Sequence, residues 1–172
     1  MANEYAFTTA NGQPVKRELL LAYLNTGTAD APVWSVIGKR VTDSSMEFDW
    51  AEEGAIDILG NNNVSLSKPT ITQTFDPCPL EAGDAAQKLI WDTAIVQQDY
   101  VALASMEMLI VHTYANFAET YSACRVTPSS LGGAGGASVG MPIDVTYGGI
   151  RTVGSATTED GVVTFVPKNE SI

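Results

Sequence analysis

Hydrophobic and polar residues alternate along several short stretches of this chain, a pattern that places every second side chain on one face of a β-strand. Residues 46–50 alternate apolar with acidic side chains, and residues 56–58 repeat this alternation. Residues 64–66 and 71–75 alternate on the far side of residues 60–63, whose Gly-Asn-Asn-Asn sequence favours a tight turn because both residue types tolerate positive φ. This region therefore predicts a long hairpin with acidic residues on its polar face.

Further strands are predicted on either side of this hairpin. Residues 33–41 are rich in β-branched and aromatic side chains, with Gly38 as a bulge or a point of close approach. Residues 100–114 predict a long strand that is apolar on both sides and therefore central in a sheet. Asp160-Gly161 lies between two strand-like runs and indicates a second hairpin.

One segment, residues 83–98, predicts a helix. Asp84 followed three residues later by Gln87 resembles a capping box, in which two side chains satisfy free amides at the start of a helix. The apolar residues that follow share one stripe at helical spacing and include Ala86, Leu89, Ile90, Ala94 and Val96. Many short strands and one helix predict a mainly β protein, a β-sandwich or barrel-like domain with one flanking α-helix.

The length of 172 residues fits a single domain spanning residues 1–172, and no internal repeat divides it. Residues 15–24 fit either a short strand or a helical turn. Residues 1–30 contribute little to the strand pattern and are interpreted as an extended N-terminal arm. Residues 130–140 contain a glycine-rich run and predict a flexible loop.

The charge balance restricts the partners of this chain. Nine Lys and Arg against 20 Asp and Glu give a net charge of −11. Binding to a phosphate backbone depends on Lys and Arg displacing counterions, so tight binding to nucleic acid or to anionic membranes is disfavoured. The longest apolar stretch, residues 101–111, is too short and too polar to span a bilayer. Without a secretory signal at its start, the chain is expected to fold in the cytoplasm.

No residue pattern for catalysis, cofactor binding or metal binding stands out. His112 is the only histidine, and its place within a predicted strand favours a structural role because nothing nearby marks a partner carboxylate or nucleophile. Cys78 and Cys124 are far apart and are read as free thiols. The expected sets of catalytic, cofactor-binding and metal-binding residues are therefore empty.

Two groups of residues have a functional and a structural interpretation. Acidic residues gather in one region, at Glu47, Asp49, Glu52, Glu53 and Asp57. Paired carboxylates can hydrolyse glycosides or bind calcium, but this spacing fits no calcium loop and a solvated polar face is favoured. Three tryptophans could form a sugar-binding platform or anchor a core or interface: Trp34, Trp50 and Trp91.

The order of these elements resembles the major tail tube proteins of long-tailed bacteriophages, over about residues 33–166. The likeness lies in the Trp-Ser-Val-Ile-Gly strand at residues 34–38, the acid-alternating strands around residues 56–58, and the Phe-Asp-Pro-Cys-Pro-Leu-Glu-Ala-Gly-Asp run at residues 75–84 that leads into the helix.

This resemblance implies a structural virion protein of the phage tail, made in the host bacterial cytoplasm. Six copies would form a homo-hexameric ring whose inner wall is one barrel of strands. Stacked rings would enclose the tape-measure protein, meet tail terminator and tip proteins, and later pass DNA without binding it. An acidic lumen avoids trapping phosphates, and Glu47, Asp49 and Asp57 are the candidates for lining it.

Other functions remain open at this stage. The inner tube of a contractile injection system, either a bacteriocin or a type VI secretion system, shares the architecture. A monomeric carbohydrate-binding β-sandwich that uses the tryptophans is a second class. An enzyme that uses Glu52 or Glu53 is the least favoured, and no enzymatic activity is expected.

Overall fold

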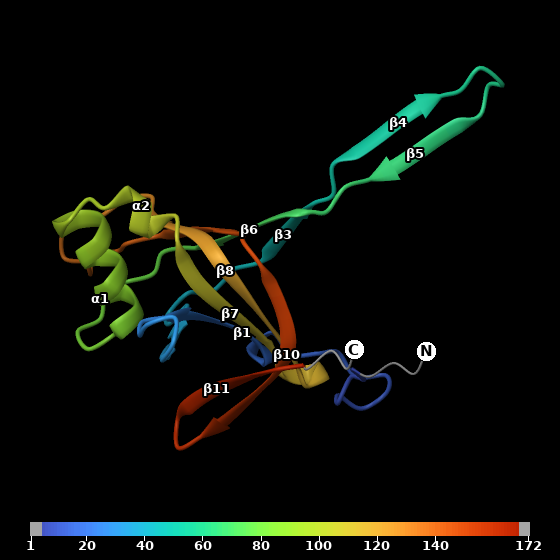
Figure 1. The fold of residues 1–172 in the computed structure, drawn as a ribbon. Helices are drawn as coiled ribbons and strands as arrows, with labels where there is room; N and C mark the ends of the chain where they lie inside the picture. Colours follow the sequence, from blue (N-terminus) through green and yellow to red (C-terminus); the bar gives the residue numbers. More distant parts are fainter. Residues whose placement is uncertain (1–4, 169–172) are drawn as a thin grey trace.

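The computed structural model describes residues 5–168, and more of them lie in strands than in helices (Figure 1). The strands are β1 (Leu20–Asn25), β2 (Trp34–Ile37), β3 (Met46–Asp49), β4 (Glu52–Ile56), β5 (Asn62–Leu66), β6 (Thr70–Phe75), β7 (Met106–His112), β8 (Phe117–Pro128), β9 (Ile143–Tyr147), β10 (Arg151–Glu159) and β11 (Val162–Pro167). The helical segments are η1 (Arg17–Leu19), α1 (Ala85–Trp91), the π-helical η2 (Asp92–Val96), α2 (Tyr100–Leu103) and η3 (Thr113–Ala115). The predicted mainly β fold with one main helix is confirmed.

Nine strands form one curled, half-barrel sheet, called the body below together with its helices. The order along the sheet is β2-β1-β7-β8-β9-β6-β3, and β10 branches from β8 and carries β11. The long strand β8 connects the β7 and β10 side of the sheet to the β9 side. Its first half pairs with β7 and β10, and its second half pairs with β9. β2 and β3 are left at the two ends of this path.

Both faces of β7 are covered, which explains its apolar sequence. Met108 and Ile110 belong to the main core, which also contains Ile90 of α1. Leu109 points to the other face and packs with Val163 of β11. The inference that a strand with two apolar sides is central is therefore confirmed, since β7 lies between β1 and β8.

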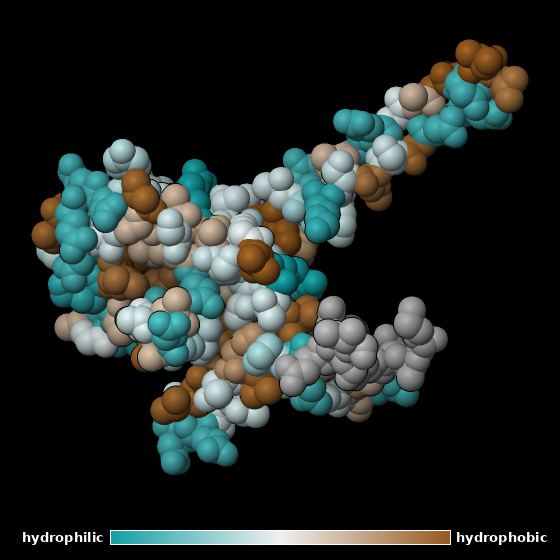
Figure 2. All heavy atoms as spheres, viewed as in Figure 1, coloured by the Kyte–Doolittle hydropathy of each residue, from teal (hydrophilic) through white to brown (hydrophobic). Residues whose placement is uncertain are grey.

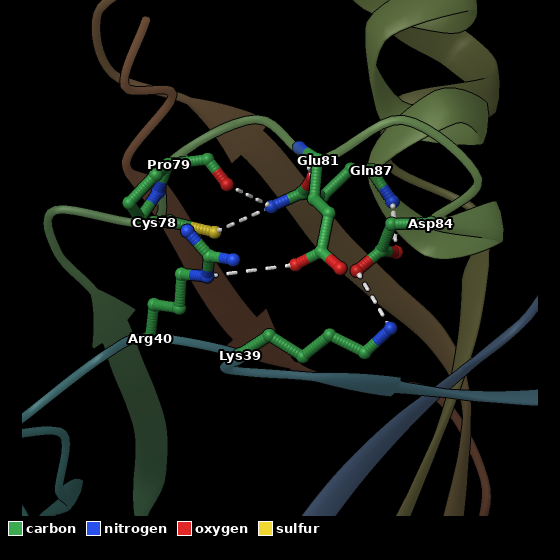
Figure 3. Close-up of polar contacts among 7 residues, drawn as sticks. All are labelled: Lys39, Arg40, Cys78, Pro79, Glu81, Asp84 and Gln87. Carbon is green, nitrogen blue, oxygen red and sulfur yellow. Dashed lines mark hydrogen bonds and ion pairs between the residues drawn. The ribbon is translucent and has the colours of Figure 1, made fainter. Parts of the chain in front are cut away.

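The helix is tied to the loop before it by a buried glutamine (Figure 3). The Asp84 carboxylate accepts a hydrogen bond from the Gln87 amide at 3.1 Å, as a capping box requires. The second half of the predicted box is wrong, because the Gln87 side chain accepts from the Glu81 amide at 2.8 Å and donates to the Pro79 carbonyl at 2.8 Å. Gln87 therefore holds the loop instead of the helix start.

The segment after β2 contacts the same loop through two ion pairs (Figure 3). Lys39 lies 3.8 Å from Asp84, and Arg40 lies 3.7 Å from Glu81. Gly38 precedes them with a φ of 107°, a left-handed conformation that favours glycine. The chain therefore turns sharply at Gly38 and places two cations beside the start of α1.

The predicted strand over residues 100–114 is wrong at both ends. Residues 100–103 form α2, because the Asp99 carboxylate accepts a hydrogen bond from the Ala102 amide at 3.0 Å and caps a short helix. The chain leaves the sheet after His112 and forms the turn η3. Strand β8, the longest in the protein, follows at once and was not predicted.

Both predicted hairpins are present. Asp160 and Gly161 have φ values of 50° and 80°, and they join β10 to β11. Residues 57–61 join β4 to β5, so the turn comes earlier than the predicted residues 60–63, and residues 57–58 of the predicted strand lie in the turn. Residues 15–24 contain both of the alternatives considered, a helical turn in η1 and a strand in β1, and β1 lies within the sheet. Residues 1–4 of the expected N-terminal arm lie outside the described residues.

Candidate assembly surface

The β4–β5 hairpin projects from the body (Figure 1). It continues the β3–β6 pair beyond Ala51, whose φ is 23°, and beyond Pro69. The Ser67 amide donates to the Ala51 carbonyl at 3.2 Å and links the two pairs. Every residue of both strands is exposed, so the described part of the chain, residues 5–168, buries neither face.

The two faces of this hairpin differ in polarity. Residues directly opposite each other in an antiparallel pair share a face, and Glu52 pairs with Leu66, Gly54 with Val64, and Ile56 with Asn62. Ile56, Val64 and Leu66 therefore lie on one side, together with Glu52, Gly54 and Asn62. We call this side the apolar face, because its three large side chains are apolar and are 76%, 54% and 64% exposed. Glu53, Ala55, Asn63 and Ser65 occupy the opposite, mostly polar face. Figure 2 shows hydrophobic side chains along the projecting hairpin and at its tip.

Asp57 organises the turn at the end of the hairpin. Its carboxylate accepts hydrogen bonds from the amides of Leu59 and Asn61, both at 2.9 Å, and from the Asn61 side chain at 3.0 Å. The hydrogen bonds from Asn61 hold the pKa of Asp57 below its ordinary value. The turn is therefore formed locally, without support from the body.

A groove of about 880 Å³ opens where the hairpin leaves the body. We call it the base groove; it is lined by Phe48, Trp50, Lys68, Pro69, Ile71, His112, Phe117, Glu119, Tyr121, Tyr147, Gly148, Gly149, Ile150 and Arg151. Phe48 and Trp50 stack at 6.2 Å between ring centroids and are about half exposed. The lining combines exposed aromatic and aliphatic side chains with a few charged groups.

A buried carboxylate lies in this groove. Glu119 of β8 is 5% exposed and meets Arg151 of β10 at 2.6 Å. Its second oxygen lies 3.4 Å from Nε2 of His112, and the other ring nitrogen of His112 lies 2.8 Å from the Tyr114 hydroxyl. These contacts join β7, β8 and β10 through one charged group.

Burial and the neighbouring side chains have opposite effects on the pKa of Glu119. Burial alone would raise the pKa of this carboxyl, but the hydrogen bond with His112 and the positive charge of Arg151 outweigh burial and lower it. Burial is also the main reason that the pKa of neighbouring Tyr121 rises to about 12. Glu119 is therefore held as a carboxylate that neutralises Arg151.

The expectation for His112 was half right. The side chain is partly buried and packs against Phe117, as a structural histidine does. No nearby residue pattern marked a partner carboxylate, yet Glu119 is one. Their pairing depends on the unpredicted strand β8, which runs antiparallel to β7 and brings the two residues to the same face.

The candidate lumen residues do not form one cluster. Glu47 and Asp49 are exposed and lie on one face of β3, while Met46 on the other face packs against the core. Asp57 lies at the far end of the hairpin, where the turn uses its carboxylate. Glu52 and Glu53 point to opposite faces of β4. Within residues 5–168, no three His, Cys, Asp or Glu side chains are arranged to hold a metal ion.

The tryptophans and cysteines lie apart from one another. Trp50 lines the base groove, Trp91 lines a hollow at the start of α1, and Trp34 packs against the small cluster around Leu109. Cys78 and Cys124 are buried free thiols. Burial raises the pKa of both thiols, that of Cys124 to about 11, so neither has the lowered pKa of a reactive cysteine.

No family model matches this chain, and no curated protein matches its sequence. Solved structures do resemble its fold. The cap of an anti-feeding prophage, titled a tube terminating cap, is 19% identical, covers 86% of this chain and 95% of its own, and has a TM-score of 0.47. A sheath-tube complex of an extracellular contractile injection system is 11% identical, covers 86% and 99%, and has a TM-score of 0.48.

A sheath/tube terminator of the same kind of injection system is 12% identical, covers 85% of this chain and 100% of its own, and has a TM-score of 0.46. These structures are described as a tube terminating cap, a sheath-tube complex and a sheath/tube terminator, and none is described as a phage tail tube. At these identities the likeness extends to the fold alone. Among residues 5–168, no helix is long and apolar enough to cross a membrane.

Proposed function

We propose that this chain is a structural subunit that assembles with copies of itself into a tube of the phage tail type. The observation that carries the proposal is the β4–β5 hairpin, which displays an apolar face that residues 5–168 leave uncovered. A two-stranded hairpin alone is at best marginally stable in water. An uncovered apolar face on such an element gains stability when a neighbouring subunit covers it.

The open sheet supports the same proposal. A closed barrel has no edges, whereas β2 and β3 end the main path of this half-barrel. Edge strands have unpaired backbone groups that can continue the sheet into a neighbouring copy. Closing a ring of copies in this way would produce an inner barrel, and six copies in stacked rings is the arrangement we propose.

The net charge of −11 fits a tube that conducts DNA. A wall with this sign repels phosphates and offers no counterion-releasing contacts. We propose that Glu47 and Asp49, which share the exposed face of β3, line this passage. Asp57 is a weaker member of the set, because its carboxylate is engaged in the turn.

Negative-stain electron microscopy of the concentrated protein tests the assembly. Stacked rings or hollow filaments are expected. A monodisperse monomer at every concentration, measured by light scattering, would contradict the proposal. Native particles that carry an outer sheath would place the tube in a contractile system instead.

The lining of the passage is tested separately. Glu47→Lys with Asp49→Lys should leave tubes visible by microscopy but slow DNA delivery, because the wall then attracts phosphates. Asp57→Lys alone separates a turn effect from a lumen effect. Particles with the paired change and unaltered infectivity would exclude Glu47 and Asp49 from the wall.

A further inference from the structure

A second groove, of about 690 Å³, lies where the half-barrel is open. The two ends of the sheet path are β2 and β3, and residues 38–45 join them directly, so this segment spans the gap between the ends. The groove lies between this segment, β1 and the end of β2, and we call it the seam groove. Leu20 and Val41 line it, half-buried, and pack against the main core. Its volume is within the range of pockets that bind ligands.

The seam groove is positive, although the chain as a whole is acidic. Four of the nine Lys and Arg residues are Lys16, Arg17, Lys39 and Arg40. All of these except Arg40 line the groove, and Glu18 is the one carboxylate among the lining residues that the structure describes. The formal charge is therefore three minus one, or +2. The base groove is less positive, because it contains two cations and one carboxylate, and the carboxylate is paired with one of the cations.

Arg17 is bound by carbonyl groups and not by a carboxylate. Its Nε and Nη2 donate to the Ser44 carbonyl at 3.2 and 3.0 Å, and its Nη1 donates to the Leu20 carbonyl at 2.5 Å. Within residues 5–168, neither Arg17 nor Lys16 forms an ion pair. Neutral carbonyls fix the guanidinium without neutralising it. Because Arg17 is also exposed, its charge is available to a partner.

The residue that holds Arg17 is itself anchored in the body. The Ser44 hydroxyl donates to the Thr74 carbonyl at 2.7 Å and accepts from the Gln73 side chain at 3.0 Å. Gln73 is 4% exposed and accepts from the Tyr147 hydroxyl at 2.7 Å. These hydrogen bonds connect the wall of the seam groove to β6 and β9. A cation that is fixed before binding loses little conformational freedom when a partner arrives.

We propose that the seam groove binds an acidic segment of a different protein, whose carboxylates meet Lys16, Arg17 and Lys39 and whose apolar side chains cover Leu20 and Val41. Charge complementarity selects this occupant and fixes its orientation. Nucleic acid is less suited, because its phosphates need cations along a longer surface and meet a chain with a net charge of −11.

A contact that depends on charge also suits a different protein better than a second copy. Two copies repel each other through their net charge of −11, whereas another protein can present an acidic segment without an equal net charge. The inference therefore goes beyond the proposed function, since it concerns a partner other than the copies that build the tube.

A peptide titration followed by NMR tests the groove. The probe is a short peptide in which Glu and Leu alternate, and the protein is kept below the concentration at which it assembles. We expect the amide signals of residues 16–22 and 36–44 to shift on binding. A control peptide with Gln in place of every Glu should bind about tenfold more weakly, because it loses the contacts with three exposed cations. Added salt should weaken binding of the Glu peptide.

A matched pair of variants locates the charge that matters. Lys16→Gln should lower the affinity for the Glu peptide about twofold to fivefold, the range expected for one exposed ion pair. The variant should fold normally, because Lys16 forms no ion pair within residues 5–168. Lys68→Gln removes the same charge from outside the seam groove and should leave the affinity unchanged.

Several outcomes would overturn the proposal. These are an absence of shifts at the seam groove up to about 1 mM peptide, equal binding of the Gln peptide, and equal losses in the two variants. Displacement of the peptide by a single-stranded DNA oligonucleotide would identify nucleic acid as the occupant instead. Shifts of the same signals on raising the protein concentration alone would identify a second copy. None of these results bears on the tube, which microscopy of the concentrated protein decides.

Discussion

The body and the β4–β5 hairpin are built from similar strands but differ in how those strands are covered. Ile110 of β7 is 1% exposed, whereas Ile56 of β4 is 76% exposed. In the body, alternating residues meet a helix on one side and a second layer of strands on the other. In the hairpin the same alternation produces an apolar face that residues 5–168 leave open. Alternation therefore predicts which face is buried, but not which molecule buries it.

Of the changes considered, removal of the hairpin should have the largest effect, which is a loss of assembly. Joining Trp50 to Pro69 through Asn-Gly in place of residues 51–68 keeps the β3–β6 pair and deletes only exposed strands. We expect filaments to disappear while the melting temperature changes by less than about 4 °C, because little buried surface is lost. Microscopy and circular dichroism measure the two effects. Filaments that persist would show that the hairpin is dispensable for assembly.

A matched pair of isoleucine substitutions sharpens the comparison in terms of stability. Ile110→Ala should lower the free energy of unfolding of the unassembled protein by about 2–5 kcal/mol, because it leaves a cavity in the core. Ile56→Ala should change it by less than about 0.5 kcal/mol, because the side chain is exposed in the monomer. Urea denaturation at low protein concentration gives both values. Similar losses at the two sites would mean that the monomer itself buries the hairpin.

Glu119→Gln should have an intermediate effect that depends on pH. We expect a loss of about 1–3 kcal/mol at pH 7, because a charged hydrogen bond to a half-exposed arginine is weakened. The pKa of Glu119 is lowered in the folded state from its ordinary value of 4.5. Its contribution is therefore complete above pH 4.5 and is lost as the pH falls through the folded pKa.

The difference between the wild-type protein and Glu119→Gln should shrink below pH 4.5 in denaturation curves measured at several pH values. A difference that stays constant across this range would show that the carboxylate charge contributes nothing. Glu107→Gln, which also removes one carboxylate from this part of the sheet, controls for general charge effects.

The smallest effect is expected at the tip of the hairpin. Asp57→Ala removes the acceptor of the Leu59 and Asn61 amides, so these amides should exchange with solvent faster. Hydrogen exchange measures this, while the melting temperature should stay unchanged because the turn lies outside the body. A lowered melting temperature would show that the two regions are coupled.

The sequence predicted the elements whose signals are local. The Asp160-Gly161 turn, the hairpin around residues 60–63 and the helix after Asp84 depend on neighbours along the chain, and all three are present. The helix α2 had a local signal too, since Asp99 is a favourable N-cap, but the apolar residues after it suggested a strand.

Features that depend on distant residues could not be predicted in the same way. In β8, the consecutive polar residues Glu119 and Thr120 are both buried, so the sequence of this strand looks like that of a polar segment. Glu119 is tolerated there because Arg151, far along the chain, neutralises it. The base groove needs β3, β8 and the turn before β10 together, so no single stretch of sequence reveals it.

The continuity between the hairpin and the β3–β6 pair has a mechanical consequence. A pull on the tip enters the sheet along the axes of β3 and β6, and β6 is paired on both sides, with β3 and β9. Antiparallel hydrogen bonds run perpendicular to the strands, so such a pull loads the whole row in shear instead of opening one bond at a time. The projection can therefore bear tension between neighbouring molecules without peeling its own domain apart.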